Sequence, residues 1–208
     1  MARQKAGLQP QSFCRYRRAM LAILEKPEMR RHALPLSVAA YLRMAELGLV
    51  DEKTELIRGV IFEKMSKSPL HSGLIQILLE LFQPHLPPDY SVRIEQPLKL
   101  RDSCPEPDLA IVSGNARDFL REHPATARFI IEIAVSSEAL DREKAAVYAE
   151  AGVEEYWIVL PDRCVIERFT QPGAHGYAEH DSIVPGGTAS SLTFPEFEVN
   201  LDRLLAEG

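Results

Sequence analysis

The sequence has few cysteines, and their positions exclude the common cysteine-based scaffolds. Cys14, Cys104 and Cys164 are odd in number and far apart, so they fit neither a disulfide framework nor the spacing of a zinc site. The sequence also lacks long apolar runs, and none approaches the roughly 18 residues that a membrane span requires. We therefore expect no membrane segment and a reducing, cytoplasmic setting.

The chain also lacks an overall positive charge, since its formal net charge is -6. This balance argues against indiscriminate binding of nucleic acid. The charge is unevenly distributed, because residues 1–31 carry a net charge of +6 and the remainder carries -12. We predict a basic N-terminal extension, residues 1–31, and one domain, residues 32–208. The extension could contact nucleic acid or could have no binding role; the second interpretation is favoured, because charge runs are usually solvated.

Hydrophobic periodicity predicts helices and strands that alternate along the chain. Helices are expected from Ser37 to Gly48, from Pro69 to Phe82, around 116–121 and at 141–151. Strands are expected on both sides of Arg58-Gly59, and at 90–100, 107–112, 128–135, 155–160, 164–169 and 179–184, before a closing apolar segment at 192–205. This order predicts an α/β (α+β) fold, with a mixed central β-sheet and helices on both faces. The strands at 107–112 and 128–135 should be neighbours, and the helix at 141–151 should cross over between two parallel strands.

Two carboxylates lie in segments that should be buried strands. Asp108 directly precedes the apolar run 109–112, and Glu132 lies inside the run 129–135. An ionised carboxylate is costly in such a strand unless a cation, a metal or several donors meet it. The helix that follows supplies Lys144. Two carboxylates on neighbouring strand ends and one lysine are the minimum needed to hold a divalent metal and to position a water molecule.

The order of these motifs resembles a known nuclease superfamily. Pro107-Asp108, Glu132 near the end of an apolar strand and Lys144 on the next helix resemble the PD-(D/E)XK restriction-endonuclease-like superfamily. A closer resemblance, from about Leu36 onward, is to a bacterial family of putative restriction endonucleases. Its other motifs are matched here by Glu55-Leu56-Ile57-Arg58-Gly59, by His71 at the start of a helix, and by Gly152-Val153-Glu154-Glu155-Tyr156-Trp157.

The resemblance implies a restriction-endonuclease-like fold and Mg²⁺-dependent hydrolysis of DNA phosphodiester bonds, with Mn²⁺ as the alternative cation. It implies that Asp108 and Glu132 are metal ligands, and that Glu55 is a further ligand or holds a metal-bound water. Lys144 would stabilise charge on the phosphate or orient the attacking water. One departure concerns the lysine: the superfamily motif places it two residues after the second carboxylate, where this chain has Ala134. Because nucleases of this class often dimerise to cut two strands, a homodimer is also expected.

Each of these residues has a structural alternative. Glu132 could be a buried ion-pair partner, Asp108 a turn or cap residue, Glu55 a solvated strand carboxylate, and Lys144 a solvated helix lysine. His71 is more readily explained as a capping or surface residue than as a catalyst. Two other functions also stay open. One is a non-catalytic module of the same fold that binds nucleic acid or a protein, and the other is a metal-dependent hydrolase of small phosphodiesters.

Overall fold

The computed structural model describes residues 22–65 and 67–206, and the chain divides into two compact units between Pro35 and Leu36. The described part of the first unit contains the short helix α2 (Pro27–Arg30), which begins with a proline. Cys14 and most of the predicted basic extension lie outside the described residues. Within the described ranges, Cys104 and Cys164 are both free thiols. None of the helices in these ranges combines the length and the apolar character needed to cross a membrane.

The second unit is built on a six-stranded sheet with the order β3-β4-β5-β6-β7-β8. Its strands are β3 (Tyr90–Ile94), β4 (Leu109–Ser113), β5 (Phe129–Ile133), β6 (Glu155–Leu160), β7 (Val165–Gly173) and β8 (Gly176–Ile183). Strands β5 and β6 are parallel, and every other neighbouring pair is antiparallel. The predicted mixed central sheet is therefore confirmed, and so is the adjacency of the strands that carry Asp108 and Glu132.

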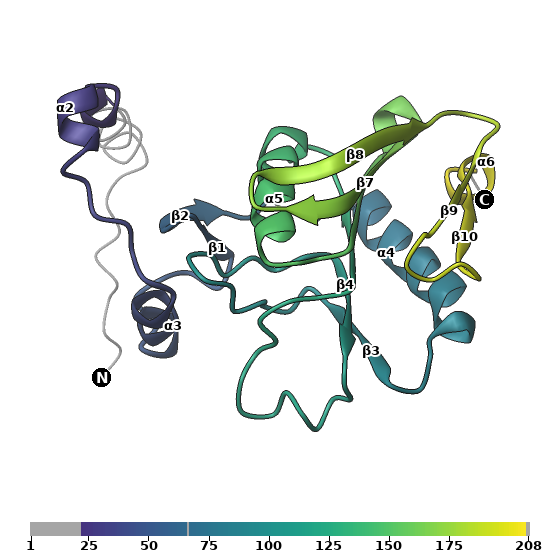
Figure 1. Cartoon of the computed structure of the whole chain (residues 1–208), viewed down its shortest axis with the longest axis horizontal. Helices are drawn as coiled ribbons and strands as arrows, with labels where there is room; N and C mark the ends of the chain where they lie inside the picture. Colours follow the sequence, from purple (N-terminus) through teal and green to yellow (C-terminus); the bar gives the residue numbers. More distant parts are fainter. Residues whose placement is uncertain (1–21, 66, 207–208) are drawn as a thin grey trace. The chain divides into compact units, whose positions relative to one another are not determined.

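Two helices, α4 (Pro69–Phe82) and α5 (Glu138–Glu150), cover opposite faces of this sheet (Figure 1). Successive side chains of a strand point to opposite faces. Ile131 and Ile133 of β5 accordingly pack in the apolar core on the side of α4, while Ile130 packs in the core on the side of α5. The same alternation directs Glu132 toward α5, so its carboxylate and the residues of that helix share one face of the sheet.

The amphipathic face of α4 organises the larger core. Its buried residues, Leu74, Ile75, Leu78 and Phe82, recur with helical spacing. The Phe82 ring makes edge contacts with Phe194 and Phe197, at centroid distances of 5.3 and 4.7 Å. These contacts hold the closing segment, with β9 (Thr188–Ser190), β10 (Glu198–Asn200) and α6 (Leu201–Leu204), beside α4 (Figure 1).

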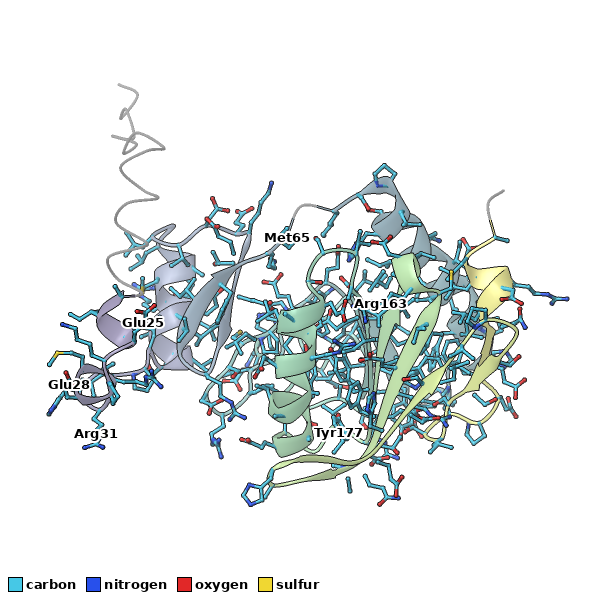
Figure 2. All side chains as sticks on the ribbon, turned by 90° about the horizontal axis from the view of Figure 1, so that it is seen from above. Glu25, Glu28, Arg31, Met65, Arg163 and Tyr177 are labelled. Carbon is cyan, nitrogen blue, oxygen red and sulfur yellow. The ribbon has the colours of Figure 1, made fainter. Side chains whose placement is uncertain are left out.

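Helix α5 is the crossover between the parallel strands β5 and β6, as the sequence predicts. In Figure 2, Arg163 and Tyr177 mark the two ends of this helix. The Arg163 guanidinium lies 3.0 Å from Glu138 at the helix start, and the Tyr177 hydroxyl donates to the carbonyl of Val153 just after the helix end, at 2.9 Å. Arg163 belongs to the 3₁₀ turn η2 (Pro161–Arg163), and a second such turn, η1 (Gln83–His85), follows α4.

A small hairpin lies outside the main sheet and carries one of the predicted site residues. It consists of β1 (Thr54–Ile57) and β2 (Val60–Glu63), which pair in antiparallel register. Arg58 and Gly59 between them have φ values of 51° and 74°, as two-residue hairpin turns require. The preceding helix α3 (Val38–Glu46) is capped by Ser37, as predicted. The hairpin holds Glu55 on β1, and that strand is fully buried.

Several elements differ from the predictions: β7 and β8, for example, are Val165–Gly173 and Gly176–Ile183 instead of 164–169 and 179–184. The strand expected at 90–100 ends at Ile94, because Glu95 adopts a left-handed conformation with a φ of 51°. The helix expected around 116–121 is a turn. The Asp118 carboxylate accepts the backbone N–H of Asn115 at 2.8 Å, and local side-chain hydrogen bonds of this kind compete with the backbone bonds of a helix. Helix α5 begins three residues earlier than expected, at Glu138.

Candidate active site

A cavity of about 230 Å³ lies among the predicted site residues. Its wall is formed by the link between β2 and α4, which contains Met65 (Figure 2), and by the first turn of α4. The ends of β3, β4 and β5 and the start of α5 complete it. The lining is strongly acidic, and its carboxylates belong to Glu55, Glu63, Glu95, Glu106, Asp108, Glu132 and Asp141. The basic groups among its lining residues are Lys64, Lys67, His71 and Lys144.

The antiparallel pairing of β4 and β5 brings Asp108 and Glu132 together. The backbone N–H of Asp108 donates to Glu132 Oε2 at 3.1 Å, and the N–H of Ile133 donates to Asp108 Oδ2 at 2.7 Å. Each carboxylate therefore accepts a backbone hydrogen bond from the opposite strand. Such bonds fix the orientation of both groups toward the cavity.

Lys144 reaches the two strands from α5, although the position two residues after Glu132 is Ala134. Its Nζ atom lies 3.0 Å from Glu55 Oε1 and 3.2 Å from both Glu132 Oε1 and Asp141 Oδ1. The lysine is only 4% exposed, so this is a buried ion cluster and not a solvated helix lysine. One turn further along α5, the Tyr148 hydroxyl donates to Glu132 Oε1 at 2.9 Å.

The cluster contains more acidic than basic groups, and burial is the main cause of the pKa shifts of its carboxyl groups. Burial raises the pKa of Glu132 well above its ordinary value, although the charge of Lys144 opposes the shift. Burial likewise raises the pKa of Asp141. Burial alone would lower the pKa of Lys144, but its carboxylate neighbours more than offset this and raise the value well above normal. The neighbouring carboxylates therefore favour the charged form of the lysine, and a further positive charge would favour the ionised forms of the surrounding carboxyl groups.

His71 lines the same cavity, in contrast to its interpretation as a surface or capping residue. Its Nε2 atom lies 3.1 Å from Asp108 Oδ2, and the cap of α4 is provided instead by Ser68, whose Oγ accepts the His71 backbone N–H. The hydrogen bond to Asp108 raises the pKa of His71. A histidine at the start of a helix is a weak signal by itself, and only the packing of α4 against β4 brings it to Asp108.

Glu95 also lines the cavity, and the sequence analysis did not identify it. Its backbone N–H donates to the carbonyls of Pro107 and Asp108, at 3.1 and 3.2 Å, and its carboxylate pairs with Lys67. One ligand atom from each of His71, Glu95 and Asp108 can be chosen so that all lie within 4.8 Å of one another. No local pattern identifies Glu95, because its position depends on hydrogen bonds to residues that are distant in the sequence.

All four predicted residues, Glu55, Asp108, Glu132 and Lys144, thus line one cavity. They are divided between a buried layer around the Lys144 ammonium and a second layer around the His71 ring. Glu55 and Glu132 face Lys144 in the buried layer, whereas Asp108 connects Glu132 to His71. Carboxylate oxygens in excess of nearby cations fit a divalent metal, since Mg²⁺ prefers oxygen ligands.

Comparisons with known proteins agree with this architecture. A crystal structure of a putative nuclease belonging to DUF820, from Anabaena variabilis ATCC 29413, matches with a TM-score of 0.64 and 17% sequence identity. The match covers 82% of this chain and 98% of that chain, and at this identity it shows a shared fold. No curated protein matches the chain.

The family comparison tests the resemblance that the motifs predict. Residues 38–202 match the model of the Uma2 family, whose description is "Putative restriction endonuclease". This range contains both β1 and α5, and so all four predicted site residues. The predicted relationship to the restriction-endonuclease-like superfamily is therefore confirmed, and the chain belongs to the Uma2 family of putative restriction endonucleases.

Proposed function

We propose that this protein is a metal-dependent endonuclease that hydrolyses DNA phosphodiester bonds. The observation that carries the proposal is the convergence of Glu55, Asp108, Glu132 and Lys144 in one acidic cavity. The membership of the Uma2 family supports the same reaction class. A cavity that served only to stabilise the fold would gain nothing from an excess of carboxylates beside open space.

The residues of the cavity fit a divalent cation, and Asp108, Glu132 and Glu55 would hold it. Mg²⁺ is the expected ion and Mn²⁺ the alternative, because both accept carboxylate ligands. The bound ion would polarise the scissile phosphate and lower the pKa of a water molecule. The fit rests on the donor set: Lys144 is shared by three acidic side chains in the buried layer, and a divalent cation would add the positive charge that favours their ionised forms.

The chain's own residues orient this arrangement. Lys144 would stabilise negative charge on the phosphate or orient the attacking water, and its raised pKa keeps it charged at neutral pH. The N–H of Ile133 and the ring of His71 fix Asp108 in place. Tyr148 holds Glu132 from the opposite side. Precise placement of this kind lowers the barrier by reducing reorganisation during the reaction.

Nicking of supercoiled plasmid tests the proposal directly. Wild-type protein should convert plasmid to the open-circular form in Mg²⁺ or Mn²⁺ and should be inactive in a chelator. Asp108→Ala and the double variant Asp108→Ala, Glu132→Ala should lose this activity. Asp162→Ala, which changes an exposed aspartate in η2, is the matched control and should behave like wild type. Unchanged cleavage by the double variant would overturn the proposal.

A non-catalytic binding module of the same fold is the second candidate, and one observation favours it. Both Glu132 oxygens already accept internal donors, from Lys144 and Tyr148 on one side and from the Asp108 N–H on the other. A purely structural network would have this form. Calorimetric titration with Mg²⁺ and Mn²⁺ separates the candidates, because a module without a metal site would bind neither ion.

We also propose a binding partner, an oligomeric state and a cellular location for the protein. DNA is the expected substrate, and a homodimer would provide two sites for two strands. Residues 32–208 would form the catalytic domain, with residues 1–31 as an extension, in the reducing cytoplasm. Light scattering that shows only monomers, with and without DNA, would contradict the dimer.

A further inference from the structure

Three cavity residues outside the buried lysine cluster have the composition of a mixed-ligand metal site. His71 comes from the first turn of α4, Glu95 follows the end of β3, and Asp108 precedes β4. Their ligand atoms can all lie within 4.8 Å of one another. The group therefore combines one imidazole and two carboxylates, drawn from three separate segments.

The distance between His71 and Asp108 suits two ligands of one ion. Adjacent ligands of an octahedral ion, at bond lengths of roughly 2.1–2.2 Å, lie about 3 Å apart. His71 Nε2 and Asp108 Oδ2 are 3.1 Å apart. An ion could therefore bind both atoms with little movement of either side chain.

One atom of this group has unused bonding capacity that an ion could meet. Glu95 Oε1 is buried and has no hydrogen-bond partner among the described residues. Lys67 pairs with the other oxygen of Glu95, so Oε1 is free to bind an ion while that pair persists. A buried acceptor without a donor is costly, and a cation beside it would relieve that cost.

We propose that His71, Glu95 and Asp108 form a second cation position in the cavity, which prefers Mn²⁺ to Mg²⁺. It shares Asp108 with the position assigned to Asp108, Glu132 and Glu55, and so it rests on the proposed metal-dependent function. The preference follows from ligand chemistry. Imidazole suits transition metals, whereas Mg²⁺ requires oxygen ligands and a nearly ideal octahedron.

The competing explanation is that His71 only orients Asp108 through a hydrogen bond. Histidine–carboxylate pairs of this kind are common beside metal sites. The two explanations differ in what lies next to the ion. In the proposed site a nitrogen atom is bonded directly to the cation, whereas an orienting histidine would leave only oxygen ligands.

Pulsed electron paramagnetic resonance of bound Mn²⁺ makes this distinction. Wild-type protein with Mn²⁺ should show modulation from a directly bonded nitrogen nucleus, and His71→Gln should remove it. His85→Gln, which changes an exposed histidine outside the cavity, is the matched control and should keep the signal. Modulation that survives in His71→Gln, or bound Mn²⁺ without nitrogen modulation in wild type, would overturn the proposal.

Affinity for Mn²⁺ tests the other ligand. Glu95→Gln preserves the shape of the side chain and should weaken Mn²⁺ binding by about tenfold or more, with a smaller effect on Mg²⁺. Glu122→Gln, at an exposed position, should change neither affinity. An equal loss of both ions, or no loss, would contradict the proposed preference. Circular dichroism of each variant establishes that it is folded.

The proposed function and the second cation position can fail separately. If wild type nicks plasmid with Mg²⁺ but Mn²⁺ shows no nitrogen ligand, the nuclease stands and the second position is wrong. If the nitrogen ligand is found but no nucleic acid is cleaved, the second position stands and the nuclease is wrong. Glu132→Gln should abolish nicking while the nitrogen modulation persists, because Glu132 belongs to the other position.

Discussion

At the scale of single residues, burial does not by itself distinguish a site carboxylate from a structural one. Glu155 and Glu132 are both buried in strands of the central sheet. Glu155 accepts hydrogen bonds from neutral donors, Trp157 Nε1 and Ser191 Oγ, each at 2.7 Å. Glu132 instead faces the cation of Lys144 and lines the cavity. What distinguishes Glu132 is surplus negative charge beside open space.

Isosteric substitution of these two glutamates should separate catalysis from stability. Glu132→Gln should abolish metal-dependent nicking, because it removes a proposed ligand. Glu155→Gln should lower the free energy of unfolding by about 1–3 kcal/mol, since its donors lose a charged acceptor. It should leave the nicking rate of folded protein unchanged. Urea unfolding and the plasmid assay measure the two effects, and loss of nicking in folded Glu155→Gln would contradict this assignment.

The buried ammonium should contribute strongly to stability. Lys144→Met leaves three carboxylates without their shared cation, and removing one partner of a buried ion network costs about 3–5 kcal/mol. Lys99→Met changes a half-exposed lysine that lies 3.7 Å from an exposed glutamate, so its effect should stay within about 0.5 kcal/mol. Urea unfolding followed by circular dichroism compares the two. Equal effects would show that the cluster is not a buried network.

At the scale of helices and strands, sequence patterns were sufficient where neighbouring residues determine the structure. The helix at Pro69–Phe82 matches its prediction, because a cap, an N-terminal proline and an apolar stripe all act locally. The strand from Tyr90 ends at Ile94, which no local signal indicates. The backbone of Glu95 is held there by carbonyls of residues 107 and 108, and such contacts are invisible in a sequence window.

The same division explains how much of the candidate site could be predicted. Asp108 and Glu132 are local anomalies, since each places a charge beside or inside an apolar strand. The helical pattern that follows the Glu132 strand supplies Lys144, and the family resemblance identifies Glu55 and also includes His71. His71 and Glu95 lie on elements whose local patterns are ordinary. Their contribution depends on how α4 and the end of β3 pack against β4, which only the folded structure provides.

The core face of α4 provides a matched test of the predicted periodicity. Leu78 is fully buried, whereas Leu81 on the same helix is 40% exposed. Leu78→Ala should lower the free energy of unfolding by about 2–5 kcal/mol, because it leaves a cavity among packed side chains. Leu81→Ala should cost about 1 kcal/mol or less, since much of that side chain already contacts water. Comparable losses in thermal or urea unfolding would contradict the assigned orientation of the helix.

At the scale of the whole molecule, the excess of basic residues and the proposed site residues lie in different parts of the sequence. All residues proposed for the site lie between Glu55 and Lys144, in the second unit. The +6 charge of residues 1–31 stands against -12 in the remainder. An acidic domain repels DNA at long range, so a basic extension could assist binding without touching the site.

Deletion of residues 1–31 separates these contributions. We expect the nicking rate at saturating DNA to stay unchanged, because the cavity is formed entirely by the second unit. If the extension neutralised phosphates of duplex DNA, its deletion would reduce the slope of log affinity against log salt by about 0.9 for each phosphate. Since charge runs are usually solvated, we expect that slope to stay constant as well. A reduced slope would establish that the extension binds DNA, whereas an absence of nicking at saturating DNA would contradict the location of the site.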